Sequence, residues 1–517
     1  MDRPPRFIVE PSREGPPTLV VAHGESRSYL HSSVSPSRER HSLLAEFHPD
    51  RYDVLIVLGV GLGYHLLPLS GGKIRYRRVL LIDILPGIEA EISRNTVTSR
   101  IINAESQLVS GSAIDEIETI LNDFIAAGID RGIQVIEHPA SIRLFPEYYG
   151  SVREIIRRAV DRFGGNTATR TAFGPRYLRN AILNMAAVER STPVTSLYNR
   201  LTGVPGVVVT SGPTLDRVLP LLKRARSRVA LIAVDSAVPS LTGAGITPDI
   251  AVSIDPQQHV CEHFAHGWSD TIATVFSPTS YPLAPRRRPG FISLNTHPVS
   301  QLLEELRPGA IGSIDSLTGT VAGDAVLLAH RLGLSPIALA GFDFCFPGHT
   351  IYARNTAYQR RFTLYFQDRF SPVETRNLTY IMKSSGGYLI DGRYSRRSFE
   401  TYRSSIESLL RRESIQNVYR LESTGVPLEG AGDTTAERFL SGIPEHPTGA
   451  ENAIGAVVGS RPAPSQRAFV HDLRAVLSRD DVRERLLTTS LGDRASGAII
   501  DSLKRKMVYI LDMEETQ

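Results

Sequence analysis

From residue 204 onward, short and wholly apolar segments alternate along the chain with segments of helical periodicity. The apolar segments read GVVVT (206–210), VALIAVD (229–235), IAVSID (250–255), ATVFSP (273–278), GFISLN (290–295) and PIALAGFDFC (336–345). A helical stretch, AGDAVLLAHRLG (322–333), precedes the last of them and ends at Gly333. Strands that are apolar on both faces and alternate with helices are typical of a parallel, doubly wound sheet. The sequence therefore predicts an α/β protein with a central Rossmann-like parallel sheet domain.

A second, smaller Rossmann-like α/β domain is predicted before it. The segment DVLIVLGVGLGYHLLPL (53–69) reads as a strand, a turn with Gly59, Gly61 and Gly63, and a helix. The next predicted strand, RRVLLIDI (77–84), ends in Asp83. This order matches the opening of a dinucleotide or S-adenosylmethionine unit, although the full G-x-G-x-x-G is absent. Two interpretations stay open: a bound ligand, or glycines that only allow tight packing of helix on strand.

The chain divides into four predicted regions: an amino-terminal domain (1–150), a helical connector (151–195), the central domain (196–435), and a linker with a carboxy-terminal helical domain (436–517). The connector is expected to break at GGNTATRTAFGP (164–175), because Gly and Pro disfavour helix interiors. The stretch 442–466 is rich in Pro and Gly and reads as a linker. Helical apolar spacing follows it, and these tail helices are a candidate surface for a homo-oligomer.

Composition excludes several classes of protein. The 517 residues carry a formal net charge of only +4 without a long basic run, so no nucleic-acid partner is expected. Two cysteines, Cys261 and Cys345, rule out a disulfide framework and a zinc ribbon. The amino terminus lacks the apolar core of a signal peptide, and no apolar run reaches the roughly 20 residues of a membrane helix. We therefore expect a cytoplasmic protein without membrane insertion.

The segment HVCEH (259–263) matches the H-x-x-E-H pattern of one class of zinc metalloproteases. Such a site needs a helix in the middle of a domain and a further ligand nearby. Here the pattern directly follows the end of a predicted strand. We interpret it as a solvated first turn of a helix, so no metal ligand is assigned.

The segment TSGPTLD (210–216) combines features that bind anions. A P-loop is excluded, because no G-x-x-x-x-G-K-[ST] occurs in the chain. Gly212 allows close approach of the backbone, and the following helix begins with unpaired N–H groups and a positive dipole end. The sequence predicts an anion site at Ser211, Gly212, Pro213 and Thr214.

Polar residues follow other predicted strands at the same edge of the sheet. Asp235 and Ser236 follow one strand, Asp255 ends the next, and Asp343 follows Gly341 in the last. In open α/β sheets, ligands bind outside the carboxyl ends of the strands. A hydroxyl-rich loop before the helix at 322 offers a second anion site at Ser316, Thr318, Gly319 and Thr320. These segments together predict one ligand site.

The same segments resemble the motility accessory factor (Maf) glycosyltransferases, whose middle domain belongs to the superfamily of archaeal 6-hydroxymethylpterin diphosphokinase. The stretches that carry the resemblance are TSGPTLD, AVDSAVPSLTGAGITPDIAVSIDP, DSLTGTVAGDAVLLAHRLGLSPIALAGFDFCF and NVYRLESTGVPLEGAG. The glycine turn and the connector are similar to the family's amino-terminal domain and linker, so the resemblance covers about 50–435. LAGFDFCFPGHTIYA is also similar to bacterial sialyltransferases that use CMP-sugars.

The resemblance implies transfer of a nonulosonic (sialic-acid-like) sugar from a CMP-sugar donor to Ser/Thr hydroxyls of flagellin. Ser211–Thr214, Ser316 and Thr318–Gly319 would hold the cytidylate, and Asp235 and Asp255 would orient ribose or base. Asp343 or His349 would accept the acceptor's proton, and Tyr352 would donate to the leaving phosphate. The chain departs from the family at Thr214, where Ser is usual. It also has no His between 349 and 446, where the sialyltransferases carry theirs.

No cofactor is required by this chemistry, and Mg²⁺ would be held by the strand-end acids only with a triphosphate ligand. Two alternatives remain. The first is an ATP- and Mg²⁺-dependent 6-hydroxymethylpterin diphosphokinase, which shares the strand-end acids. The second is a flagellin-binding chaperone that keeps the nucleotide fold without catalysis.

Overall fold

The computed structural model describes residues 5–23, 26–41, 46–70, 74–95, 97–98, 106–126, 132–282, 290–306, 308–366, 368–443, 479–482 and 484. Contacts divide the chain into two compact units, unit 1 (Met1–Thr167) and unit 2 (Ala168–Gln517). Most of the predicted linker and the predicted tail helices lie outside the described residues. Within these ranges, no helix combines the length and the apolar character needed to cross a bilayer.

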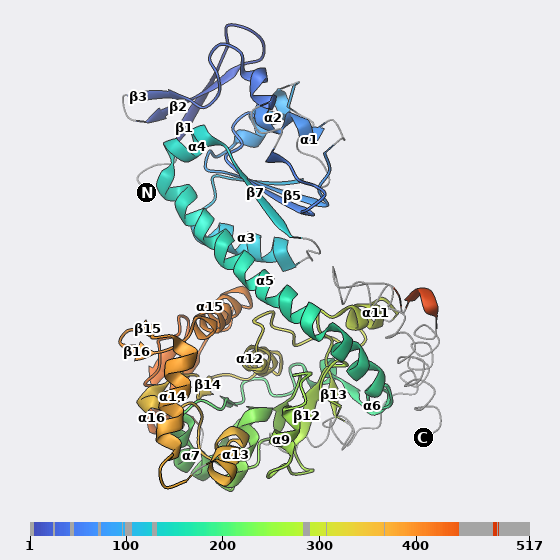
Figure 1. Cartoon of the computed structure of the whole chain (residues 1–517), viewed down its shortest axis with the longest axis vertical. Coiled ribbons are helices and arrows are strands. Elements are labelled where there is room, and N and C mark those ends of the chain that lie inside the picture. Colours follow the sequence, from blue (N-terminus) through green and yellow to red (C-terminus); the bar gives the residue numbers. More distant parts are fainter. Residues whose placement is uncertain are drawn as a thin grey trace. The chain divides into compact units, whose positions relative to one another are not determined.

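Unit 1 contains a parallel sheet in the order β6-β5-β4-β7. Its strands are β4 (Val54–Leu58), β5 (Arg78–Asp83), β6 (Ser106–Ser110) and β7 (Ile133–Glu137), with helices α1 (Leu67–Ser70), α2 (Ile88–Arg94), α3 (Ile114–Ala126) and α4 (Pro139–Leu144). All of β4 is buried, as its wholly apolar sequence predicted. A separate antiparallel sheet consists of β1 (Arg6–Glu10), β2 (Thr18–His23) and β3 (Ser26–Tyr29) (Figure 1). The predicted Rossmann-like opening is confirmed.

Helix α5 (Pro146–Leu183) runs without interruption through the connector. The predicted break at 164–175 is therefore wrong. In a helix interior each glycine costs about 1 kcal/mol and a proline about 3 kcal/mol. Burial of apolar side chains at the start of the helix (Tyr149, Val152, Ile155) and near its end (Leu178, Ile182) outweighs that local cost.

Unit 2 is built on nine strands in the order β18-β17-β14-β9-β10-β11-β12-β13-β8. Every neighbouring pair is parallel. The predicted strands are confirmed as β9 (Gly206–Val209), β10 (Ala230–Val234), β11 (Ile250–Val252), β12 (Ala273–Phe276), β13 (Phe291–Ile292) and β14 (Ile337–Ala340). Three further strands were not predicted: β8 (Thr192–Pro193), β17 (Val418–Leu421) and β18 (Gly432–Thr434).

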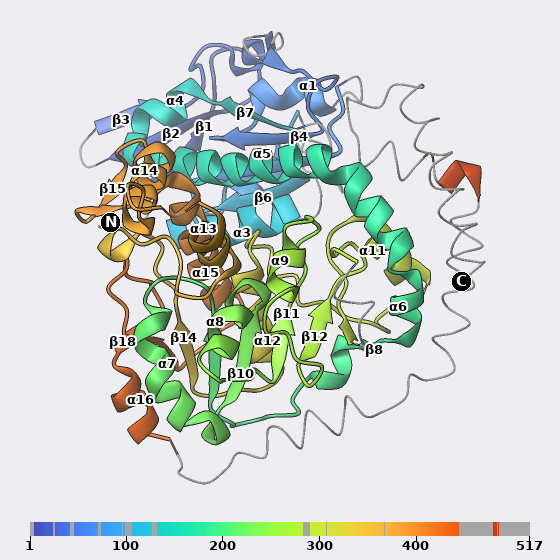
Figure 2. The same cartoon turned by 60° about the horizontal axis from the view of Figure 1, so that its bottom comes forward.

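Helices cover both faces of this sheet. Helix α12 (Val321–Arg331) contacts β9, β10 and β11, and α8 (Val238–Gly243) lies on the other side of the strands (Figure 2). Helix α9 (Val260–Phe264) packs against α8 and the turn that follows β10. The Thr320 hydroxyl caps α12 by accepting from the Gly323 amide, and Gly333 follows it with φ +83°. The other helices of unit 2 are α6 (Met185–Arg190), α7 (Leu215–Arg224), α11 (Pro298–Leu306), α13 (Ala357–Tyr365), α14 (Val373–Ser385), α15 (Arg397–Arg412) and α16 (Ala436–Ser441).

Candidate functional site

The strand order of unit 2 places the candidate site. From β9 the chain continues to β10, β11, β12 and β13 on one side, whereas β14, β17 and β18 lie on the other side. The direction of strand addition therefore reverses between β9 and β14. Ligands of open α/β sheets bind at the carboxyl ends of the strands beside such a reversal. Here the carboxyl ends of β9 and β14 carry Ser211–Gly212 and Gly341–Asp343.

The turn after β9 and the turn after β14 bind each other. The Asp343 carboxylate accepts the Thr214 amide (3.1 Å, Oδ2) and the Thr214 hydroxyl (2.6 Å, Oδ1). A Cβ on Gly212 would lie 2.1 Å from the Gly341 carbonyl oxygen and 2.5 Å from Asp343 Oδ2. The turn and Asp343 thus converge, but the carboxylate itself takes the place of an anion at the start of α7. Asp343 is buried, and burial raises its pKa.

Ser211 joins this turn to the end of β10. Its hydroxyl accepts a hydrogen bond from the Ser236 hydroxyl at 3.1 Å. Its carbonyl oxygen accepts the Ala353 amide at 2.9 Å, which holds the segment after Tyr352 beside the end of β9. Pro213 supports the turn through its carbonyl oxygen, which accepts the Asp216 amide at 3.3 Å. The two serine hydroxyls therefore meet at the carboxyl edge of the sheet.

Asp235 forms a pair with a histidine that sequence reasoning did not select. Its Oδ2 accepts the Ser253 hydroxyl at 2.9 Å, and its Oδ1 lies 3.4 Å from His263 Nδ1, an ion-pair distance rather than a well-formed hydrogen bond. Burial alone would lower the pKa of His263, but Asp235 and then Asp255 and Glu262 raise it. A carboxylate fixed by a hydroxyl and paired with an imidazole is the arrangement of a general base.

Asp255, at the end of the next strand, extends the same charged group. Its Oδ1 accepts the Gln257 amide at 2.8 Å, and its Oδ2 lies 3.6 Å from His259 Nε2. Burial, together with the Asp235 charge, raises the pKa of Asp255. In HVCEH, His263 thus faces Asp235 and His259 faces Asp255. Among the described residues, this segment is not part of any group of three potential metal ligands.

The loop before α12 holds the predicted hydroxyls. The hydroxyl oxygens of Ser316 and Thr318 are 2.8 Å apart, and those of Thr318 and Thr320 are 3.2 Å apart. Gly323 makes this possible, because a Cβ there would lie 2.0 Å from Thr318 Oγ1. Gly319 has φ +71°, and Leu317 has φ +59°, which is unusual for a bulky residue. Such strain is concentrated at functional sites.

Asp324 lies beneath that loop and was not predicted as a site residue. Its Oδ1 accepts the Ser316 amide at 2.7 Å. Burial, then the neighbouring Asp315 charge, raises the pKa of Asp324 to about 8. Its carboxyl group is therefore protonated over much of the neutral range, and strongly shifted groups gather at functional sites.

Tyr352 and His349 lie on the segment that follows Asp343. Tyr352 packs against Tyr358 with ring centroids 5.4 Å apart, and burial followed by Tyr380 raises its pKa. It therefore stays protonated and able to donate. His349 is exposed, with φ +56° and its ring 5.8 Å from that of Tyr394. Among the described residues, the His349 ring forms no hydrogen bond or ion pair with Asp343 or Ser211, whose side chains bind Thr214 and Ser236 instead.

Two buried asparagines near the end of the connector fix the loops after β11 and β12. Asn180 Nδ2 donates to the carbonyl oxygens of Pro256 and Thr279 at 2.9 and 3.1 Å. Asn184 Nδ2 donates to Pro278 and Ser280 at 2.9 and 2.8 Å. The end of the connector therefore supports the carboxyl edge of the sheet directly.

In unit 1, side chains bind the amides of the glycine turn. The Val60 and Gly61 amides donate to Asp83 Oδ2 at 2.7 and 2.8 Å, and the Leu62 amide donates to His31 Nε2 at 2.8 Å. A Cβ on Gly61 would lie 2.4 Å from His31 Nε2. Of the two interpretations of this turn, the geometry supports close packing, because Asp83 and His31 occupy the amides that a ligand would use.

Sequence reasoning missed His263 because it was grouped with His259 as part of a solvated turn. The usable signal was its helical spacing. His263 of α9 lies four residues after His259, the residue that precedes the helix as its N-cap, so the two rings project from one side of the helix toward different strand ends. Nothing in the sequence marked Asp324 as a site residue, because acidic residues are common in the first turn of a helix, where the helix dipole favours them.

Comparisons with known proteins agree with this architecture. Residues 179–349 match the family described as 6-hydroxymethylpterin diphosphokinase MptE-like. The solved structure of a Maf glycosyltransferase from Magnetospirillum magneticum AMB-1 superposes with a TM-score of 0.55 at 13% identity. That superposition covers 99% of this chain and 86% of the other chain. The predicted resemblance is confirmed: the chain has a Maf-type fold with an MptE-like region.

Two proteins of Treponema pallidum (strain Nichols), both described only as uncharacterized, are also similar. One is 28% identical over 277 residues, which are 53% of this chain and 56% of that protein. The other is 28% identical over 113 residues, which are 22% of this chain and 53% of that protein. The chain thus spans little more than half the length of these relatives.

Proposed function

We propose that this protein is a glycosyltransferase that moves a nonulosonic sugar from a CMP-sugar donor to Ser/Thr hydroxyls of flagellin in the cytoplasm. The observation that carries the proposal is the likeness in fold to the Maf glycosyltransferase, which extends over almost the whole chain and includes unit 1 and α5. The polar groups at the carboxyl edge of unit 2 give the proposal its chemistry.

Transfer from a CMP-sugar creates negative charge on the leaving phosphate and needs a base for the acceptor hydroxyl. In the proposed site, the hydroxyls of Ser211, Ser236, Ser316 and Thr318 bind the cytidylate, and Asp255 orients the ribose. Tyr352, which burial keeps protonated, donates to the departing phosphate.

The base in this proposal is His263, with Asp235 orienting it, rather than Asp343 or His349. Asp343 is committed to the Thr214 amide and hydroxyl, so it serves to hold the turn in shape. His349 lies exposed on the segment beyond. His263 is 14% exposed and sits against a carboxylate that Ser253 fixes, which suits an imidazole that must accept a proton.

The experiment is transfer of the sugar to purified flagellin, followed by the mass increase of the acceptor. His263→Asn should lower kcat by about 10²- to 10⁴-fold, the usual contribution of a general base. His259→Asn is the matched control, because it is on the same helix, half exposed and paired with a different acid; its kcat should stay within a few-fold of wild type. Equal losses in the two variants would refute the assignment of the base.

A pH profile separates catalysis from a structural effect. The acidic limb of kcat should follow His263, whose pKa is raised by Asp235. Asp235→Asn removes that charge, so the limb should move to lower pH while the maximum rate falls. A limb that does not move would contradict the pairing.

A second candidate function follows from the match of residues 179–349 to the 6-hydroxymethylpterin diphosphokinase MptE-like family. It predicts release of AMP from ATP and Mg²⁺ in the presence of the hydroxymethylpterin. Thermal shift with CMP and CDP against ATP, GDP and UDP, each with and without Mg²⁺, ranks the two candidates, because stabilisation follows affinity. Tight flagellin binding without any cytidine-nucleotide binding would instead favour the chaperone.

A further inference from the structure

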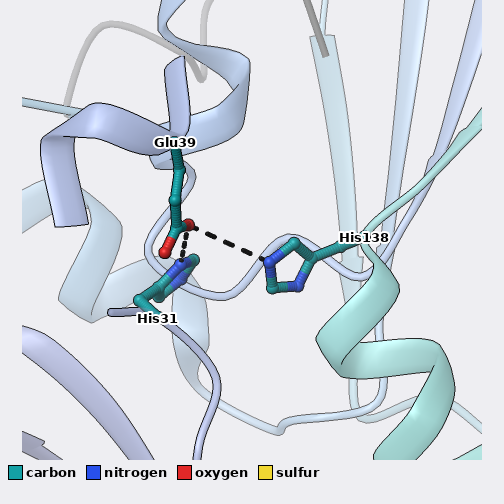
Figure 3. A group of neighbouring side chains, drawn as sticks. All are labelled: His31, Glu39 and His138. Atoms are coloured by element: carbon teal, nitrogen blue, oxygen red, sulfur yellow. Dashed lines mark hydrogen bonds and ion pairs between the residues drawn. The ribbon is translucent and has the colours of Figure 1, made fainter. Parts of the chain in front are cut away.

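A cluster of histidines in unit 1 has no part in the proposed sugar transfer. His31 follows β3, Glu39 lies in the short 3₁₀ helix η1 (Pro36–His41), and His138 lies between β7 and α4. Figure 3 shows the Glu39 carboxylate between the two imidazoles. Its Oε2 is 2.6 Å from His31 Nδ1 and 4.0 Å from His138 Nε2. Residues more than a hundred positions apart thus bring three potential metal-ligand atoms together.

His138 presents one nitrogen to the carboxylate. Its Nδ1 lies 2.8 Å from the Ser141 hydroxyl, which fixes the ring and leaves Nε2 facing Glu39. A metal-ligating histidine usually has its other ring nitrogen hydrogen-bonded to a neighbouring group that fixes the ring, and Ser141 is such a neighbour here.

The distance between the two ligand atoms suits one shared cation. Two ligands at about 2.1 Å from a zinc ion lie about 3.4 Å apart in a tetrahedral site and at most about 4.2 Å apart. The 4.0 Å between Glu39 Oε2 and His138 Nε2 is below the linear limit, and an approach of the two side chains by about 0.6 Å would give the tetrahedral separation. The Glu39 side chain is 22% exposed, so the site lies near the surface of unit 1.

His31 acts on Glu39 instead of offering a lone pair. The Leu62 amide donates to His31 Nε2, so the ring proton is on Nδ1 and is donated to Glu39 Oε2. The Ser32 amide donates to Oε1 of the same carboxylate at 2.8 Å. His31 therefore positions the carboxylate toward His138.

A third imidazole packs against His138 in this cluster. His65, in the 3₁₀ helix η3 (Tyr64–Leu66), is fully buried and stacks on His138 with ring centroids 4.5 Å apart. Neither of its ring nitrogens has a partner that meets hydrogen-bond geometry, although the Gly59 backbone lies close by. Buried polar atoms left in this state in native proteins often mark a water or an ion.

We propose that unit 1 binds one divalent transition-metal cation of the zinc class through Glu39 and His138, with His31 positioning Glu39 and water completing the coordination. Nitrogen and carboxylate donors favour Zn²⁺ and its neighbours over Ca²⁺ or Mg²⁺. The site lies beside the glycine turn, because His31 binds both Glu39 and the Leu62 amide. Its cation therefore stabilises that turn, independently of whether unit 2 transfers a sugar.

The test uses the full chain stripped with a chelator and titrated with Zn²⁺ by calorimetry, and with Co²⁺ by visible absorption. Wild type should bind one Zn²⁺ at this site, and Zn²⁺ should raise its unfolding temperature. The Glu39→Gln and His138→Gln variants should each bind one Zn²⁺ fewer than the wild type and should lack the visible absorption of Co²⁺ bound at this site. His48→Gln, an exposed histidine of the same unit, is the matched control and should bind like wild type.

Circular dichroism in chelator shows whether each variant folds, and Glu39→Gln is the mildest change because that side chain is partly exposed. His31→Gln should weaken Zn²⁺ binding about tenfold or more with the stoichiometry unchanged, as expected for a positioning residue. A purely structural His31 would lower the unfolding temperature in chelator without changing the affinity. Wild type that binds neither Zn²⁺ nor Co²⁺, or Glu39→Gln and His138→Gln variants that keep the full stoichiometry, would overturn the proposal.

Discussion

Gly212→Ala tests the close contact between the turns after β9 and β14. The added Cβ would lie 2.1 Å from the Gly341 carbonyl oxygen, 2.5 Å from Asp343 Oδ2 and 2.9 Å from the Gly341 carbonyl carbon. Contacts below 3.0 Å to backbone atoms require the chain itself to move. Gly212 does not have a positive φ, so an alanine there is not strained by its backbone conformation. The expected loss of stability arises from the steric overlap of the added Cβ.

The expected loss combines two effects. Overpacking in a well-packed region costs about 1–3 kcal/mol. Moving the turn also weakens the hydrogen bonds from Thr214 to the Asp343 carboxylate, each about 1.5–3 kcal/mol when the partner is charged. Partial relaxation leaves a total of about 3 kcal/mol, which corresponds to a fall of about 4 °C in the unfolding temperature of a unit as large as Ala168–Gln517.

The measurement is thermal and urea unfolding of the full chain, followed by a probe of unit 2. Gly442→Ala is the control: Gly442 has φ −84°, and its Cβ would make only ordinary contacts at 3.5 and 3.7 Å, so that variant should unfold like wild type. Cytidine-nucleotide binding should weaken only in Gly212→Ala. If both glycine variants unfold at the wild-type temperature, the contact between the two turns is not what holds this edge of the sheet.

Three further changes test the surroundings of the site and the histidine cluster. Asn184→Asp places a carboxylate oxygen against the Pro278 and Ser280 carbonyls and should cost about 3 kcal/mol or more in urea unfolding, whereas Asn184→Ala, which adds no charge, should cost less. The pKa of Asp324 rises from 3.8 to about 8 on folding, so its contribution to stability is complete below about pH 4 and is lost as the pH rises to about 8. Asp324→Asn keeps an acceptor for the Ser316 amide. It should remove the contribution of Asp324 to the pH dependence of the free energy of unfolding, which is at most about 1.4 kcal/mol per pH unit; an unchanged pH dependence would assign it to other groups. The pKa of His138 falls from 6.5 to about 3 on folding, so its contribution is present above pH 6.5 and is lost as the pH falls through about 3. On lowering the pH, the hydrogen-exchange protection factors of unit 1 should therefore fall more in the wild type than in His138→Gln, and an equal fall in the two proteins would contradict this.

Periodicity predicted the sheet strands well where burial is complete. The segments at 206–210, 230–234 and 337–340 are apolar on both faces, and only a strand covered by helices on both sides accommodates that pattern. The strands β17 and β18 escaped prediction because Arg420 and Asp433 interrupt the apolar pattern. In the structure these two residues form a bidentate ion pair, at 2.7 and 2.8 Å, that satisfies the buried guanidinium.

Local propensity failed at the connector, where glycines and a proline predicted a break. Propensity counts the cost of each residue where it stands, whereas burial of the apolar residues at the start and near the end of α5 acts on the whole helix. The glycine turn of unit 1 shows the same limit. Its glycines were evident in the sequence, but whether its amides face a ligand depended on His31, which is about thirty positions away in the chain.

The sequence alone determined the class of fold, the edge of the sheet where polar residues collect, and which residue types gather there. These properties follow from spacing along the chain, because alternation and strand ends are local. Only the folded chain decided which of those groups bind each other: Asp343 closes on Thr214, Asp235 faces His263, and Glu39 lies between two imidazoles. Contacts of a few ångströms between residues far apart in the sequence depend on how strands and helices pack. The spacing of residues along the chain does not determine that packing.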